Sequence, residues 1–295
     1  MFANILDILI TGLMLGGIYA MIAVGLSLQY GVGRVLNVAH GEFIMVGAFA
    51  THMLFAEYSV VPLAAIIILA PALFFIGYFV HQILFHYMRK HSPNADAVSG
   101  RSLLASFGLV FVVQNLIIII WGRNLRSYAY LNTSVSIFDT NYPVNRLMAL
   151  GIAVGASVLF FLFITQTRMG KGIRAAAEDP DMANVVGVNI QQVLGICFGL
   201  GTLLAGIAGV LISMMFQIDT AMGLEFTIIA IVVVVFGGLG SLTGSLIGGF
   251  VLGLVTSIVN FYDPSLSLIS FYAIFILLLL VKPSGLFGRQ AHGSH

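Results

Sequence analysis

The residues best suited to chemistry in this sequence are His40 and Glu42, which stand in the block N-V-A-H-G-E at residues 37–42, just ahead of an apolar run. Ionisable groups at membrane depth are costly and usually functional, so the pair can serve as a proton relay or a solute contact. A structural interpretation competes: Asn37 caps a helix, Glu42 faces the positive end of its dipole, and His40 bonds a neighbouring backbone group. We favour the structural interpretation and keep the relay as the alternative.

Enzymatic interpretations fail because the residues they need are missing. The His40-Gly41-Glu42 spacing matches half of a zinc deaminase motif, but Cys197 is the single cysteine, so the cysteine half is absent. No G-x-x-x-x-G-K-[ST] motif occurs, so the chain has no phosphate loop for ATP. A nucleophile, a base and metal ligands do not occur as a recognisable set. We therefore expect no catalytic residue, no metal and no cofactor in this chain.

The composition identifies an integral membrane protein. Hydrophobic residues make up 60% of the chain and charged residues 8%, and the apolar runs repeatedly approach the ~20 residues that cross a bilayer. The net charge of +1 argues against a nucleic-acid surface. Because most connections are short, we predict an all-α polytopic protein with one membrane domain over residues 1–288. Residues 289–295 read as an appended tail.

We expect about eight to ten membrane-spanning helices, since a span needs ~20 apolar residues. The seventh and eighth runs look short or broken by glycine, as a re-entrant hairpin or as two compressed spans. The apolar runs fall at residues 5–30, 42–56, 60–88, 102–121, 147–167, 190–218, 226–239, 242–261 and 266–281.

Basic residues predict how the chain is oriented. They gather in three connections, which the positive-inside rule places in the cytoplasm: Arg89, Lys90 and Arg101; Arg168, Lys171 and Arg174; Lys282 and Arg289. With about nine spans, the N-terminus is then outside. Residues 122–146 also fall outside, and their Tyr-, Thr- and Val-rich middle predicts a small hairpin.

Residues 168–189 form a charged island between two apolar runs. Helix formers fill residues 172–178, and Asp179-Pro180 ends this helix because the residue before proline avoids the α region. Asp179 can cap a second short helix that begins at Pro180, and Gly187 can end it in a left-handed conformation. Two short helices joined at an elbow suit a docking surface, with a solvated loop as the alternative. The docking candidates are Gly172, Arg174, Glu178, Asp179, Pro180, Asp181 and Gly187.

Small residues after the seventh run predict close helix packing. Gly240, Gly244 and Gly248 recur every four residues, a spacing that lets membrane helices approach each other. Gly237 and Gly238 complete this set of packing candidates. Ahead of the set, Asp219 and Glu225 are expected at the external mouth, where they can meet a partner or an amine, or simply be solvated.

Several blocks, in order along the chain, resemble the permease subunits of branched-chain amino acid ABC importers. They are N-x-A-H-G-E at 37–42, S-F-G-L at 106–109, G-K-G-I-R-A-A-A-E-D at 170–179, L-A-G-I-A-G at 204–209, G-G-L-G-S at 237–241 and K-P-S-G-L-F-G at 282–288. Together they cover nearly the whole chain. The sequence departs from the family pattern at residues 219–221 and 232–236, near the expected solute path. The resemblance therefore leaves amino acids, urea, short amides and aromatic acids open as substrates.

The resemblance implies a permease of the bacterial inner membrane. Its partners would be a second permease, identical or homologous, two cytoplasmic ABC ATPases that hold ATP and Mg²⁺, and an external substrate-binding protein. Residues 168–189 would dock on an ATPase, and the cargo would be a small polar solute, with branched-chain amino acids the leading candidates. The competing hypothesis is a stand-alone proton-coupled transporter or channel that uses His40 and Glu42.

Polar side chains at membrane depth are the candidates for the translocation path, because such groups should face a cavity or a partner. They are Asn37, His40, Glu42, Ser106, Gln114 and Asn115.

Overall fold

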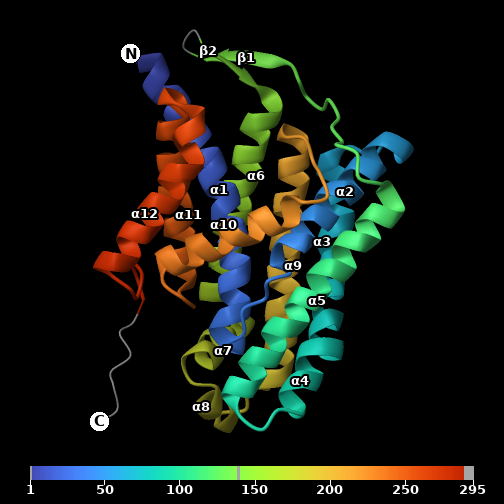
Figure 1. The fold of residues 1–295 in the computed structure, drawn as a ribbon, viewed down its shortest axis with the longest axis vertical. Coiled ribbons are helices and arrows are strands. Elements are labelled where there is room, and N and C mark those ends of the chain that lie inside the picture. The colour runs from blue at the N-terminus through green and yellow to red at the C-terminus, as the bar shows by residue number, and fades with distance from the viewer. Residues whose placement is uncertain (1, 138–139, 289–295) are drawn as a thin grey trace.

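The computed structural model describes residues 2–137 and 140–288, and most of this part of the chain is helical (Figure 1). Arg289 and the rest of the predicted tail lie outside the described residues. The helices are α1 (Phe2–Gly33), α2 (His40–Tyr58), α3 (Pro62–Val80), α4 (His86–Lys90), α5 (Ala95–Trp121), α6 (Val144–Gln166), α7 (Arg168–Glu178), α8 (Pro180–Val185), α9 (Ile190–Met215), α10 (Met222–Gly237), α11 (Leu242–Tyr262) and α12 (Ser267–Val281). A π-turn (His81–Phe85) joins α3 to α4, and a 3₁₀ turn (Pro264–Leu266) precedes α12.

Each predicted apolar run is helical, but the runs differ in length. Among the described residues, seven helical stretches are long and apolar enough to cross a membrane, whereas α10 is apolar but has 16 residues. The remaining run is α2, a 19-residue helix that is not among the seven. The predicted shortness of the seventh run is thus confirmed. The predicted break in the eighth is wrong, because α11 is a continuous helix whose glycines are accommodated at helix contacts.

The two shorter helices begin inside the molecule. After α1 ends near α7, residues 34–39 return along the molecule to its middle, where α2 starts (Figure 1). The chain also turns back after α9, and α10 then crosses the middle of the molecule (Figure 1). Both returns place non-helical backbone among packed helices, the setting in which membrane proteins tolerate it.

Small residues allow α1 and α11 to pack tightly side by side. A Cβ atom on Gly253 would overlap the backbone of Gly16, and one on Gly249 would overlap that of Ala20. Hence the glycines of α1 and α11 serve backbone contact between the two helices rather than flexibility.

The glycines that follow the seventh run divide into two groups. A Cβ atom on Gly237 would overlap Gly244, and one on Gly248 would lie 3.2 Å from the Val233 O, so these three lie where α10 and α11 approach. Gly238 and Gly240 instead belong to the turn between these helices, with φ of +106° and +79°. Positive φ is a conformation that glycine adopts without the steric cost other residues incur. Gly240 therefore shapes the turn and does not extend the helical ridge.

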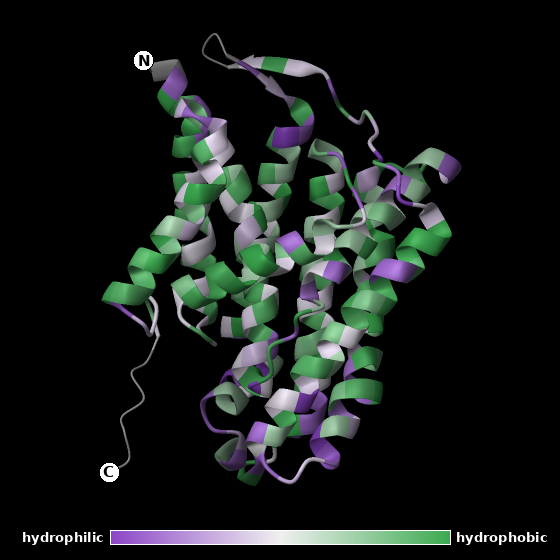
Figure 2. Ribbon diagram, in the orientation of Figure 1, coloured by the Kyte–Doolittle hydropathy of each residue, from purple (hydrophilic) through white to green (hydrophobic). Residues whose placement is uncertain are grey.

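Charge separates the two ends of the molecule. We call the end that carries α4, α7 and α8 the basic end, because α4 includes Arg89 and Lys90 and α7 includes Arg168 and Lys171 (Figures 1 and 2). The opposite end carries the antiparallel pair β1 (Ser134–Ile137) and β2 (Thr140–Pro143), in which Ser134 faces Pro143 and Val135 faces Tyr142. The predicted hairpin in residues 122–146 is thus confirmed, and we call its end the hairpin end.

Candidate functional site

A cluster of buried polar side chains lies at the start of α2. Asn37 and His40 are 0% exposed and Glu42 is 1% exposed. The Asn37 amide donates to Gln29 Oε1 of α1 over 3.1 Å, and Asn37 Oδ1 accepts the Ala39 N–H over 3.1 Å. The N-cap position of α2 is Ala39, so the expectation that Asn37 caps this helix is wrong. Its side chain closes the turn just before the helix instead.

His40 and Glu42 are packed between helices rather than placed along a water-filled route. His40 Nε2 lies 3.1 Å from the Ile22 carbonyl oxygen of α1, the backbone contact that the structural interpretation expects. Glu42 is in the first turn of α2, and its carboxylate fills the space beside Gly223 of α10. Within the described residues, His40 Nδ1 and Glu42 Oε2 have no hydrogen-bond partner. This arrangement supports a role in helix packing over a proton relay.

Thr227 of α10 is a member of this cluster that the sequence analysis missed. Its Oγ1 accepts the Gly41 N–H over 2.8 Å and lies 3.0 Å from the Val38 O and 3.1 Å from the Gly223 O. One hydroxyl proton serves one of those two carbonyls at a time. A lone hydroxyl in a run of branched apolar residues is the sequence signal for such a role.

The other three path candidates lie on α5 and do not join this cluster. Ser106 is 0% exposed and donates to the Leu103 O over 2.8 Å. The Gln114 amide donates to the Thr220 O over 2.9 Å and so ties α5 to the chain ahead of α10. Asn115 is exposed and bonds the Phe111 O over 2.8 Å within its own helix.

Glu225 lies deeper in the molecule than its place in the sequence predicts. It is exposed in the first turn of α10, and Gly223, two residues earlier, packs against Glu42 in the middle of the molecule. Asp219 differs, since its Oδ1 accepts the N–H groups of Ala221 (2.6 Å) and Met222 (3.0 Å). The external mouth is thus the wrong place for Glu225, because α10 starts far below the top of α9 (Figure 1).

An exposed face with polar groups at membrane depth runs over α5 and α10. We define the α5/α10 face by Phe111, Asn115, Leu224, Glu225 and Ile228, which are all exposed. Figure 1 shows both helices on the near side of the molecule. A carboxylate does not face lipid at such depth without a large cost, so this face requires water or another chain against it.

The charged island forms the predicted elbow at the basic end. Asp179 Oδ1 accepts the N–H groups of Asp181 and Met182, both over 3.0 Å, and Pro180 is the first residue of α8. Gly187 has a φ of +90° just after α8. The predicted elbow between two short helices is therefore confirmed. The first of them starts earlier than expected, at Arg168, because Thr167 Oγ1 accepts the Gly170 N–H over 3.0 Å.

The two sides of the elbow differ in chemistry. Ile173 and Ala176 of α7 and Ala183 of α8 are buried against the membrane domain. The outer side carries apolar groups, with Met182 66%, Val185 82% and Val186 77% exposed. Among the docking candidates, Glu178, Asp179, Asp181 and Gly187 are exposed, and Gly172 and Pro180 are half-buried. Arg174 is exposed as well, and its guanidinium bonds the Thr165 O of α6 over 3.4 Å.

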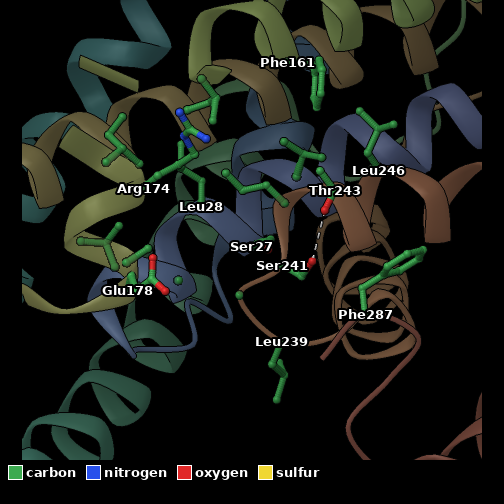
Figure 3. A pocket seen from close by; sticks show the side chains of 18 of the residues that line it. Ser27, Leu28, Phe161, Arg174, Glu178, Leu239, Ser241, Thr243, Leu246 and Phe287 are labelled. Atoms are coloured by element: carbon green, nitrogen blue, oxygen red, sulfur yellow. Dashed lines mark hydrogen bonds between the residues drawn. The ribbon is translucent and has the colours of Figure 1, made fainter. Parts of the chain in front are cut away.

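A cavity of about 620 Å³ lies between α1, α6, α7 and the start of α11. Figure 3 shows Arg174 and Glu178 of α7 on one side of it and Ser241, Thr243 and Leu246 on another. None of the six path candidates lines it. This cavity could not be predicted from the sequence, because its walls come from four separated stretches of the chain, residues 24–34, 160–178, 239–246 and 287–288.

Comparison with known proteins gives consistent matches over almost the whole chain. The family model described as branched-chain amino acid transport system / permease component matches residues 8–279. The high-affinity branched-chain amino acid transport system permease protein LivH of Salmonella typhimurium is 28% identical over 299 residues, which cover 98% of this chain and 97% of LivH. BraD of Pseudomonas aeruginosa, described in the same words, is 27% identical over 95% of each chain. The probable LivH of Methanocaldococcus jannaschii is 25% identical over 91% of this chain and 88% of its own. No solved structure matches.

Proposed function

Because this chain belongs to the permease family of branched-chain amino acid transport systems, we propose that it forms half of the membrane path of an ABC importer for branched-chain amino acids. It is a multi-pass permease of the bacterial inner membrane. Apart from family membership, the main support for this proposal is the elbow of α7 and α8, which presents an apolar outer surface at one end of a membrane domain. Such a surface needs a partner.

The basic end faces the cytoplasm in this proposal. Arg89, Lys90, Arg168 and Lys171 lie at this end, and the positive-inside rule retains loops with such an excess of positive charge on the cytoplasmic side. The N-terminus and the β1–β2 pair then lie outside, where an external substrate-binding protein delivers its solute.

An ABC ATPase occupies the outer side of the elbow. Met182, Val185 and Val186 supply the apolar centre of this contact, and Asp181 supplies acidic charge beside it for basic residues of the ATPase. Gly170 of α7 lies so close to the carbonyl groups of Phe163 and Ile164 that a Cβ atom would overlap them. Movement of the elbow is therefore passed directly to α6.

A second permease, identical or homologous, covers the α5/α10 face. Asn115 and Glu225 are exposed there at membrane depth, and polar groups at that depth face a bundle interior or a water-filled path. The solute path then lies between the two permeases, along this face. The Glu225 carboxylate is placed to receive the α-ammonium group of an amino acid, while Leu224 and Ile228 offer apolar contact to its side chain.

Purification in gentle detergent, followed by mass spectrometry, tests this assignment. We expect an ABC ATPase to co-purify with the wild-type chain and to be lost when Asp179-Pro180 is replaced by Ala-Ala. In vesicles, leucine uptake should require internal ATP and an external binding protein. A chain that purifies alone, and whose uptake without ATP is abolished by an uncoupler, would support the proton-coupled alternative instead.

A further inference from the structure

The cavity beside α7 lies between two membrane-spanning helices. Both α6 and α11 pack against α1, and both contribute to the cavity, through Phe161 and Leu246. The part of α1 beneath it is closed off, since Val24 is 4% and Leu28 1% exposed. An occupant is therefore held by the exposed side chains of the walls and rim, and not by α1.

The exposed side chains include two cations from different helices. Arg34 directly follows α1 and Arg174 belongs to α7, and both are exposed and line the cavity. Within the described residues, the Arg34 guanidinium bonds the Ala177 O over 3.5 Å and the Arg174 guanidinium bonds the Thr165 O over 3.4 Å. Each bond uses one N–H of a group that carries several, so both arginines retain donors for an anion.

The net charge of the lining is positive. Glu178, one helical turn after Arg174 on α7, is the one carboxylate among the described residues that line the cavity. Two arginines against one glutamate leave an excess of one positive charge. Thr243, in the first turn of α11, adds an exposed hydroxyl. These groups favour an occupant that carries a negative, oxygen-rich group such as a phosphate.

The other side of the cavity is apolar. Figure 3 shows Leu246 and Phe287 across the cavity from Arg174. Phe161 is 43%, Leu239 47% and Phe287 49% exposed, so these side chains offer accessible apolar surface. A free phosphate has no use for such a surface. A molecule with a charged head and hydrocarbon chains matches both sides of the cavity.

The position of the cavity along the spans fits such a molecule. It lies where α6 ends and α11 begins, because Thr165 and Thr243 both line it. Both helices are long and apolar enough to cross a membrane, so their ends lie near the boundary between hydrocarbon and headgroups. Basic pockets between membrane-spanning helices on the cytoplasmic side bind lipid headgroups.

We propose that this cavity binds an anionic phospholipid of the cytoplasmic leaflet. Its phosphate lies between Arg34 and Arg174, and its acyl chains leave between α6 and α11, along Phe161 and Leu246. The cavity of about 620 Å³ holds the headgroup, while the chains extend into the bilayer. The leaflet follows from the orientation in the proposed function, but the preference for an anionic lipid does not depend on the transported solute.

Lipid titration of the purified full chain in detergent, read by native mass spectrometry, tests the site. The two probes are palmitoyl-oleoyl phosphatidylglycerol, which is anionic, and phosphatidylethanolamine with the same chains, which has no net charge. We expect saturable phosphatidylglycerol binding that is clearly tighter than phosphatidylethanolamine binding. Arg174→Gln should weaken phosphatidylglycerol binding about tenfold, because a charge-assisted hydrogen bond is lost. Lys171→Gln is the matched control, since Lys171 is an exposed cation of the same helix that does not line the cavity.

Glu178→Gln should act in the opposite direction. Removing the negative charge beside the phosphate should tighten phosphatidylglycerol binding about two- to fivefold. Weaker binding in this variant would show that Glu178 holds an ammonium group of the lipid, and would overturn the anionic assignment.

Arg34→Gln serves as a second variant should Arg174→Gln melt at a much lower temperature without added lipid. Equal affinity of the wild type for the two lipids would overturn the site, as would equal effects of Arg174→Gln and Lys171→Gln. Displacement of the lipid by glycerol phosphate at similar concentration would assign the site to a free phosphate and overturn the lipid. None of these measurements involves ATP or uptake, so their failure leaves the proposed function standing.

Discussion

The Gly41 backbone N–H donates a hydrogen bond to the Thr227 side-chain oxygen over 2.8 Å, although these residues are 186 positions apart in the chain. This bond joins the first turn of α2 to α10, the two helices that begin in the middle of the molecule. Thr227 also lies 3.0 Å from the Val38 O, so one hydroxyl bonds backbone on both sides of the start of α2. Thr227 of α10 therefore helps to hold the start of α2 in place.

Replacing Thr227 by Val should lower the free energy of unfolding by about 1–3 kcal/mol, because the shape is kept while the buried Gly41 N–H loses its partner. The change is read as a lower melting temperature in detergent. Thr227→Ser keeps the hydroxyl and should retain most of the stability. Thr202→Val is the control, since among the described residues the Thr202 hydroxyl bonds only the Phe198 O of its own helix. Equal melting of Thr227→Val and Thr227→Ser would contradict the role assigned to this bond.

Alanine at Gly41 should be far more damaging than alanine at Gly155. A Cβ atom on Gly41 would overlap the Gly223 O, whereas one on Gly155 meets nothing within 4 Å. The overlap is with backbone, so α2 and α10 must separate, and we expect a loss of about 3 kcal/mol or more. Gly155→Ala should be neutral or stabilise α6 by up to ~1 kcal/mol. The yield of folded protein after size-exclusion chromatography compares the two, and similar yields would refute the close approach.

Substitutions at Asp179 separate the shape of the elbow from its charge. Asn keeps an oxygen that can cap α8, while Ala removes the cap at a cost of about 1 kcal/mol. If the shape of the elbow is what the ATPase recognises, Asp179→Asn should keep most of the solute-stimulated ATP hydrolysis and Asp179→Ala should lose most of it. A similar loss in both variants would show that the charge of Asp179 matters more than the cap.

Replacing Glu225 by Gln tests the solute path. Hydrogen bonds to charged groups are worth about 1.5–3 kcal/mol, so losing the ammonium partner should reduce leucine uptake per unit of ATPase about tenfold or more. Glu57→Gln is the control, because Glu57 is an exposed carboxylate near the end of α2 and is not among the residues that define the α5/α10 face. Normal uptake by Glu225→Gln would exclude this carboxylate from the path.

The elbow was predictable from the sequence because its determinants are local. Asp179, Pro180 and Gly187 each fix the backbone within a few residues, and the structure has each in its expected backbone role. The helical runs were predictable for a similar reason, since a long apolar segment in a bilayer satisfies its backbone groups by forming a helix.

The depth of a residue in the molecule and the direction in which each helix face points were not predictable, because tertiary packing sets both. Gln114 and Asn115 are adjacent, yet one bonds the chain ahead of α10 and the other is exposed. Glu225 follows a span, which suggested the outer mouth, but the returning chain carries it to the middle of the molecule (Figure 1). Glycines in α11 suggested a break, whereas they are sites where neighbouring backbones approach. The cavity needs four segments in place before it exists.

Residues 34–39 and α2 are enclosed by α9 and α10, two helices that the ribosome synthesises long after this segment. Until then α1 is present to bond Asn37 and His40, but Glu42 and the Gly41 N–H lack the α10 groups that cover them, and uncovered polar groups in hydrocarbon cost several kcal/mol each. The segment therefore cannot settle at its final depth when it leaves the ribosome. Biogenesis of this protein ends with an early stretch docking into late helices, so a chain truncated before α9 should leave α2 accessible from the aqueous side.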